Sequence, residues 1–204
     1  MASGSFSPSE STSSSLLALA RNGDPEAWRR LVALYGPLVF HWLRRWGVNE
    51  SDAADISQEV FRSVARAITK FRRESERDSF TGWLYTITAN AVRKWWQRNQ
   101  DKPHSPGGTD FHQQLANLPA PDNAVPEETI RETAELLLRR RALQLIREAT
   151  AAVHWSAFEQ TTLEGRTATE VAQSLGLTPA AVRQIKSRIL RKLRETLEDL
   201  RPGE

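Results

Sequence analysis

The sequence contains no cysteine, which excludes disulfide bonds and thiolate metal sites and fits a protein of the reducing cytoplasm. It has no apolar run long enough to cross a membrane, so membrane insertion is not expected. Its serine-rich beginning lacks the apolar core of a signal peptide. The four histidines show no metal-ligand spacing, and no stretch alternates as a β-strand does. We therefore expect an all-α, cytoplasmic protein with no metal site and no cofactor.

Residues 167–193 have the pattern of a helix-turn-helix. Thr167 and Glu170 form the T-x-x-E capping box of a first helix, and Gly176 suits the turn because it tolerates a positive φ. Thr178 caps a second helix, and Pro179 occupies its first position, where a missing N–H is harmless. In helix-turn-helix proteins the second helix enters the major groove of DNA.

The second helix of this motif has a basic outward face. The net charge of the chain is only +3, so an affinity for nucleic acid has to come from such local clusters. The side chains expected to contact DNA here are Thr178, Arg183, Gln184, Lys186, Ser187, Arg188 and Arg191. The alternative is a helical corner whose basic face is only solvated.

The chain divides into two helical blocks by composition. Residues 1–14 are rich in serine and predict a disordered head. Helical patterns fill residues 15–100, with helices expected at 24–36, 38–46, 52–71 and 80–100 and a charged segment at 72–79. Residues 101–126 are rich in proline and glycine and predict a linker, after which helical patterns resume over 127–204. The fold expected is therefore two small all-helical domains joined by a linker.

An acidic stripe runs along the predicted helix 52–71. Asp52, Asp55 and Glu59 share one face with Arg62, and the opposite face is apolar through Ile56, Val60, Val64 and Ile68. Such carboxylates can hold a cation, act as acid and base, face solvent alone or dock on a basic partner. No second carboxylate cluster or glycine-rich loop accompanies them, which argues against the cation and acid–base roles and leaves a solvated face or a docking surface, of which the segments that follow favour docking.

The predicted helix 80–100 combines basic and aromatic residues. Leu84, Ile87, Ala91 and Trp95 predict an inward stripe, and Thr86, Asn90, Arg93 and Gln97 an outward one that Lys94 and Arg98 flank. Basic groups neutralise phosphate, and aromatic rings stack on unpaired bases. Trp96 fits two interpretations, a core residue or a side chain that faces DNA.

Three motifs in order resemble bacterial RNA polymerase sigma factors of the extracytoplasmic-function (ECF) group, which keep only regions two and four. They are D-A-A-D-I-S-Q-E-V-F at 52–61, F-T-G-W-L-Y-T-I-T-A-N at 80–90, and A-F-E-Q-T-T-L-E-G-R-T-A-T-E-V-A-Q-S-L-G-L-T-P-A-A-V at 157–182. The resemblance covers about residues 15–100 and 127–197. It implies a region-two bundle and a region-four helix-turn-helix domain.

The resemblance also implies partners for particular residues. Those that match the polymerase-docking positions, on the clamp helices of the β′ subunit, are Asp52, Asp55, Gln58 and Glu59. Those expected to capture, read and melt the minus-ten element are Arg72, Arg73, Asn90, Arg93, Lys94, Trp96 and Arg98. Arg183, Gln184, Ser187 and Arg188 match the helix that reads the minus-thirty-five element.

Further implied partners are the polymerase β flap, double-stranded and melted promoter DNA, and an anti-sigma factor or other regulator, with association to the nucleoid in holoenzyme. The chain departs from the family at Lys94, where an Asp is frequent, at the aromatic pair Trp95-Trp96, and in its serine-rich head.

Two other functions fit parts of the sequence. A non-sigma helix-turn-helix regulator would keep the C-terminal domain and use the N-terminal half for sensing or dimerisation. A nucleic-acid enzyme would hold magnesium on Asp52, Asp55 and Glu59. Promoter opening by a sigma factor breaks no covalent bond, so under the favoured interpretation no catalytic residue is expected.

Overall fold

The computed structural model describes residues 16–71, 79–99 and 127–198, with only the backbone described at 127–131, 197 and 198. Among these residues the regular secondary structure is α-helical, with turns and short irregular segments between the helices. The helices are α1 (Leu16–Arg21), α2 (Pro25–Arg45), α3 (Glu50–Ala67), α4 (Phe80–Asn99), α6 (Glu127–Glu148), α7 (Ala152–Thr162), α8 (Ala168–Leu175) and α9 (Pro179–Glu198). None of these described helices has the length and apolarity needed to span a membrane. The predicted serine-rich head and the predicted linker lie outside the described residues.

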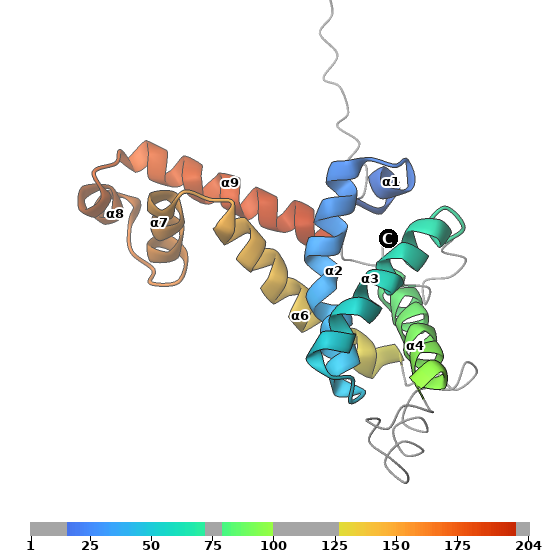
Figure 1. The fold of residues 1–204 in the computed structure, drawn as a ribbon. Coiled ribbons are helices and arrows are strands. Elements are labelled where there is room, and N and C mark those ends of the chain that lie inside the picture. Colours follow the sequence, from blue (N-terminus) through green and yellow to red (C-terminus); the bar gives the residue numbers. More distant parts are fainter. Residues whose placement is uncertain (1–15, 72–78, 100–126, 199–204) are drawn as a thin grey trace, which may run out of the picture.

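Two separate hydrophobic clusters organise the helices (Figure 1). The first gathers side chains of α1, α2, α3 and α4, and the second those of α7, α8 and α9. Helix α6 contributes to both, because Ala134, Leu138 and Ala142 are buried in the first cluster and Ile146 in the second. Along α6 the first three of these recur every fourth residue, the spacing of one helical face. Helix α6 therefore ties the two clusters together.

Helix α2 is continuous where the sequence predicts a break at Gly36-Pro37. Its start is conventional: Asp24 caps it, with the Ala27 N–H donating to Oδ1 at 2.8 Å, and Pro25 stands at the first position. Pro37 lies inside the helix and has no N–H to donate to the Ala33 carbonyl four residues earlier. Arg141 of α6 supplies the missing donor, with Nε 3.0 Å from that oxygen. The predicted break is therefore wrong, and a distant residue compensates for the proline.

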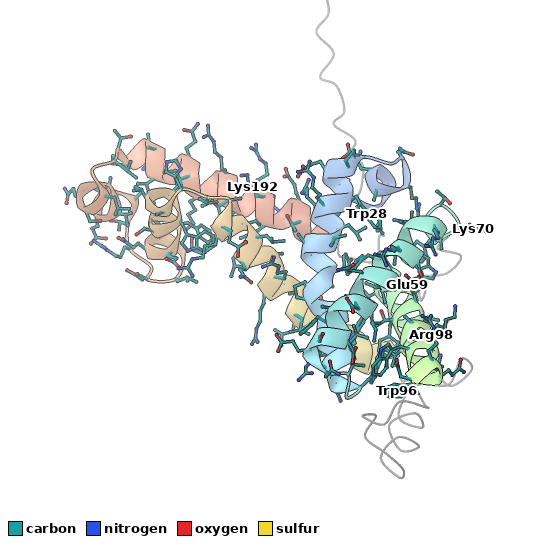
Figure 2. All side chains as sticks on the ribbon, viewed as in Figure 1. Trp28, Glu59, Lys70, Trp96, Arg98 and Lys192 are labelled. Atoms are coloured by element: carbon teal, nitrogen blue, oxygen red, sulfur yellow. The ribbon has the colours of Figure 1, made fainter. Side chains whose placement is uncertain are left out.

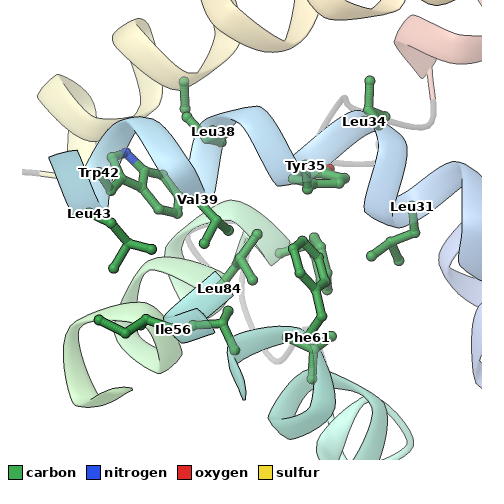
Figure 3. Close-up of a cluster of buried hydrophobic side chains, with 14 of the residues drawn as sticks. Leu31, Leu34, Tyr35, Leu38, Val39, Trp42, Leu43, Ile56, Phe61 and Leu84 are labelled. Carbon is green, nitrogen blue, oxygen red and sulfur yellow. The ribbon is translucent and has the colours of Figure 1, made fainter. Parts of the chain in front are cut away.

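Two faces of α2 are buried against different partners (Figure 3). Leu31, Tyr35 and Val39 point toward α3 and α4, whereas Leu34 and Leu38 point to the other side. There Leu34, Pro37 and Leu38 line a cavity of about 200 Å³ together with Leu137, Arg140, Arg141 and Gln144 of α6. A helix apolar on most of its surface is typical of a central core element.

Helix α3 has the predicted orientation, but α4 is rotated by about one residue. On α3 the predicted apolar stripe is confirmed, since Ile56, Val60, Val64 and the C-cap residue Ile68 are all buried. On α4 the buried side chains are Phe80, Leu84, Thr88, Ala89, Val92 and Trp96, whereas Ile87, Ala91 and Trp95 are half-buried. Helix α4 packs against α2, α3 and α6. With neighbours on several sides it has a broad apolar surface, so periodicity alone does not fix its orientation.

Candidate protein and nucleic-acid interfaces

The acidic stripe of α3 lies at the protein surface. Asp55 and Gln58 are exposed, and Asp52 and Glu59 are half-exposed. Asn49 caps the helix by accepting from the Asp52 N–H at 2.9 Å, which fixes where the stripe begins. Glu59 is paired along the helix with Arg62 at 3.4 Å and with Arg66 at 3.9 Å. Asp55 is thus an exposed acid one helical turn before Glu59 (labelled in Figure 2), which already has basic partners.

An apolar cleft borders this stripe. It has a volume of about 430 Å³ and is lined by Trp28, Val32, Gly36, Ser57, Gln58, Phe61, Arg62 and Ala65 of α2 and α3. Trp28 meets Phe61 edge to face, with ring centroids 6.5 Å apart. Gln58 belongs to both the stripe and the cleft, and its Oε1 accepts from Arg62 Nη2 at 3.3 Å. One surface therefore offers hydrogen-bonding side chains beside apolar area, which suits a protein partner.

Helix α4 presents a polar face with Asn90, Lys94, Gln97 and Arg98 exposed. Arg93 is half-buried, and its Nη1 donates to Asn90 Oδ1 at 2.7 Å, so the two side chains are held together. Its Nη2 is buried and has no hydrogen-bond partner among the described residues. The face therefore combines a hydrogen-bonded pair with exposed donors, and such donors suit phosphate and base edges.

Trp96 does not belong to the polar face of α4. The side chain is only 6% exposed and packs in the first hydrophobic cluster. It lies near the C-terminal end of α4, where Figure 2 labels it. The assignment of Trp96 to DNA contact is therefore corrected to a core position in this structure. The physical reason is the rotation of α4, which turns Trp96 inward in line with Leu84 and Val92.

Tyr85, which no sequence signal marks as special, occupies an aromatic group beside Arg93. Its ring meets Trp42 at 5.0 Å and Trp46 at 5.1 Å, both edge to face. Burial raises the pKa of Tyr85, against the opposing effects of the nearby guanidinium groups of Arg45 and Arg93. The phenol therefore stays neutral at physiological pH beneath the polar face of α4.

Residues on either side of the charged segment 72–79 form an aromatic cluster. Phe71 contacts Phe80 at 5.8 Å and Trp83 at 5.0 Å between ring centroids. Arg21 of α1 donates from Nη2 to the Phe71 carbonyl at 3.0 Å and lies over its ring at 5.5 Å. Arg72 and Arg73, predicted to contact DNA, lie outside the described residues. The side chain of Phe71 and the aromatic side chains in the first turn of α4 are therefore packed together in one cluster.

The helix-turn-helix predicted from the sequence is present in α8 and α9. Thr167 Oγ1 accepts from the Glu170 N–H at 3.3 Å, and Glu170 Oε2 accepts from the Thr167 N–H at 2.8 Å, which confirms the capping box. These hydrogen bonds lower the pKa of Glu170, chiefly through the Thr167 side chain. Gly176 has the left-handed conformation expected of it, with φ +65°. Thr178 caps α9 by accepting from the Ala181 N–H at 3.2 Å.

Most of the predicted DNA-contacting side chains of α9 face solvent. Arg183, Gln184, Ser187 and Arg188 are exposed on one side, opposite the buried Val182, Ile185 and Ile189. Arg191 is exposed and pairs with Glu195 at 3.8 Å, which leaves it accessible.

Lys186 is placed differently from its neighbours on α9. It is half-buried, and its ammonium donates to the Thr161 carbonyl of α7 at 3.1 Å. The sequence pattern groups Lys186 with the DNA-facing side chains because periodicity shows which face of a helix is polar, not which acceptor a long side chain reaches. The structure thus directs this ammonium toward the protein.

Comparisons with known proteins show which family the chain resembles. The family model "Sigma-70 region 2" matches residues 31–102, and "Sigma-70, region 4" matches residues 140–195, so the two cover more than half of the chain. The RNA polymerase sigma factor CarQ of Myxococcus xanthus is 28% identical over 88% of this chain and 94% of its own. The sigma factor CnrH of Cupriavidus metallidurans is 28% identical over 90% and 93%. The ECF RNA polymerase sigma-E factor of Escherichia coli is 31% identical over 44% of this chain and 45% of its own.

Proposed function

The chain belongs to the sigma-70 family of RNA polymerase sigma factors, in the ECF group, and from this premise we propose how its surfaces divide the work of promoter recognition. A sigma factor is a promoter-specificity factor whose partners are core RNA polymerase and promoter DNA. Such proteins act by binding and not by catalysis. The finer assignments below concern which residues meet which partner.

The stripe Asp52, Asp55, Gln58 and Glu59 docks on the clamp helices of the polymerase β′ subunit. The support is its exposure on α3 and the adjoining cleft at Trp28 and Phe61, which can receive an apolar side chain of the partner. A protein interface needs both kinds of contact, since apolar burial supplies affinity and hydrogen bonds fix register. The C-terminal domain, which corresponds to region four, docks through its own surface on the β flap of the polymerase.

The polar face of α4 reads and holds the opened minus-ten element. Asn90, Lys94 and Arg98 are exposed there, and Arg93 is steadied by Asn90. Unstacking bases costs a few kcal/mol each, and a surface that binds the unpaired strand offsets this cost. Arg72 and Arg73 remain assigned to base capture from the sequence alone.

The exposed row Arg183, Gln184, Ser187 and Arg188 on α9 is the observation that carries the proposal for the minus-thirty-five element. Arg and Gln are the side chains that pair in bidentate fashion with guanine and adenine edges in the major groove. The row stands on the second helix of a helix-turn-helix with its cap and turn intact. An anti-sigma factor or other regulator, a cytoplasmic location and association with the nucleoid complete the proposal.

Charge reversal at the docking stripe tests the assignment. Asp55→Arg with Glu59→Arg should leave the chain folded, because both side chains reach solvent, and should abolish assembly with core polymerase and run-off transcription. Glu26→Arg with Glu135→Arg is the matched control, since both are exposed acids outside the stripe. Helicity is measured by circular dichroism and assembly by size-exclusion chromatography. Assembly of a folded stripe variant as tightly as the control would overturn the docking assignment.

A further inference from the structure

The C-terminal end of α7 is bound by donors from the turn that follows it and from α9. The last carbonyls of a helix have no partner within it and need donors from elsewhere. The Glu159 carbonyl accepts from the Leu163 N–H at 2.8 Å, and the Gln160 carbonyl accepts from the Arg166 N–H at 3.0 Å. The Thr161 carbonyl accepts from Lys186 Nζ of α9 at 3.1 Å. Lys186 thus adds a hydrogen bond between α9 and the end of α7 to the packing of the two helices in the second cluster.

The Gln160 side chain joins the remaining elements at the same place. Its Oε1 accepts from Arg166 Nη1 at 2.6 Å and from Ser174 Oγ of α8 at 3.4 Å. Its Nε2 donates back to Ser156 Oγ at 3.0 Å, which holds the amide in this orientation. One half-buried side chain therefore links α7, the turn before α8, and α8 itself.

The charge of Lys186 suits this position. A helix C-terminus carries partial negative charge on its free carbonyls, so a cation there is stabilised. The flexible stem of lysine lets an ammonium reach a carbonyl while its carbons lie along apolar side chains such as those of the second cluster. An ammonium committed to the Thr161 carbonyl is turned away from the exposed row of α9.

We propose that Lys186 and Gln160 are positioning residues for promoter reading, of which Lys186 holds α9 against α7 and Gln160 holds α8 against α7, and that neither contacts DNA itself. This inference rests on the proposed function of α9. Base edges are read by hydrogen bonds of narrow geometry, so a small shift of the helix loses discrimination between bases. Phosphates are contacted through charge, which tolerates the same shift.

Salt dependence separates a positioning lysine from a phosphate-contacting one. For duplex DNA the logarithm of the binding constant falls linearly with the logarithm of the salt concentration. Each phosphate contact adds about 0.9 to the magnitude of this slope. Lys186→Met should leave this slope unchanged. It should reduce discrimination, which is the ratio of the binding constants for the preferred duplex and for one with a single mismatch, by roughly fivefold or more. Lys192→Met removes the same charge from an exposed position on the same helix (Figure 2) and should lower the slope without changing the ratio.

The experiment uses the full chain assembled with core polymerase. The probe is the duplex that holoenzyme with the unmodified chain selects from a pool randomised over the upstream element, measured by competition between about 50 and 200 mM salt. Gln160→Leu gives an independent variant, because this side chain interacts with α7, the turn and α8 rather than with α9. It should reduce discrimination as Lys186→Met does. Lys186→Arg, which keeps a cationic donor at this position, should discriminate between the two duplexes as the unmodified chain does.

Three results would count against the inference, and a fourth against its premise. If Lys186→Met reduces the magnitude of the slope by about 0.9 and leaves discrimination unchanged, Lys186 is a phosphate contact. Full discrimination in Gln160→Leu, or none in Lys186→Arg, would remove the positioning role. If Lys186→Met does not fold, the Gln160→Leu and Lys186→Arg results decide alone. Failure of the unmodified holoenzyme to select any upstream sequence would instead overturn the proposed function of α9.

Discussion

Removal of Arg141 should destabilise the junction between α2 and α6 far more than removal of its neighbour. Arg141 Nε is the donor to the Ala33 carbonyl, and the Arg141 side chain is 23% exposed. A hydrogen bond from a charged group to a partly buried acceptor contributes about 1.5–3 kcal/mol, and the carbonyl that loses it has no helical N–H to turn to. The ion pair with Glu148, at 3.7 Å and half-exposed, adds little. We expect Arg141→Met to lower the free energy of unfolding by about 2 kcal/mol.

Arg140→Met is the matched control for this change. Arg140 lines the same cavity and is exposed, and the same charge is removed. Its replacement should alter the free energy of unfolding by less than about 0.5 kcal/mol. Unfolding in urea, followed by tryptophan fluorescence, measures both variants because Trp42 and Trp96 lie in the first cluster.

A double-mutant cycle with Pro37 isolates the cause. Pro37→Ala restores an N–H four residues after Ala33, so the carbonyl regains a donor inside α2. In that background Arg141→Met should cost about 1 kcal/mol less than with proline present, because the oxygen is no longer left unsatisfied. An equal cost in both backgrounds, or a cost no larger than that of Arg140→Met, would refute the explanation of how the proline is tolerated.

Two further predictions concern the packing of α4 and the cap of α8. Trp96→Ala should lower the free energy of unfolding in urea by about 3–5 kcal/mol, as for other buried aromatic side chains. A change near zero would mean that Trp96 is not a core residue. The folded-state pKa of Glu170 lies below its ordinary value of 4.5, so its charge stabilises the folded chain above that pH and loses the effect as pH falls through the folded pKa. The stability difference between the unmodified chain and Glu170→Gln should therefore narrow in acid, and a gap that stays constant with pH would contradict it.

The parts of the fold that the sequence predicts are those decided by local chemistry. The capping box of Thr167 and Glu170, the positive φ of Gly176 and the cap of Thr178 are each fixed by residues within a few positions of one another. The apolar stripe of α3 is predictable for the same reason, since a helix with one covered face needs one stripe. Local rules of this kind fix where elements begin and end.

The parts that the sequence does not predict depend on contacts between distant elements. Proline inside a helix normally breaks it, and only the approach of Arg141 from 108 residues away makes α2 continuous. The orientation of α4 is equally non-local, because α2, α3 and α6 each cover part of it, and the covered surface is wider than one stripe. The sequence pattern therefore places Trp95 in the inward stripe and leaves Trp96 open, although of the two Trp96 is buried and Trp95 half-buried.

The same limit applies to the assignment of function to single side chains. Lys186 and Lys192 are the same residue type on one helix, and charge alone does not distinguish them. The structure distinguishes them by what surrounds each one: Lys186 is half-buried and donates to the Thr161 carbonyl at the end of α7, whereas Lys192 is exposed. A carbonyl that lacks a partner within its own helix is a strong local acceptor, so the side chain that reaches it is committed to the fold. The accounting of helix-end carbonyls therefore separates the cations that shape the reading surface from those that remain available to DNA.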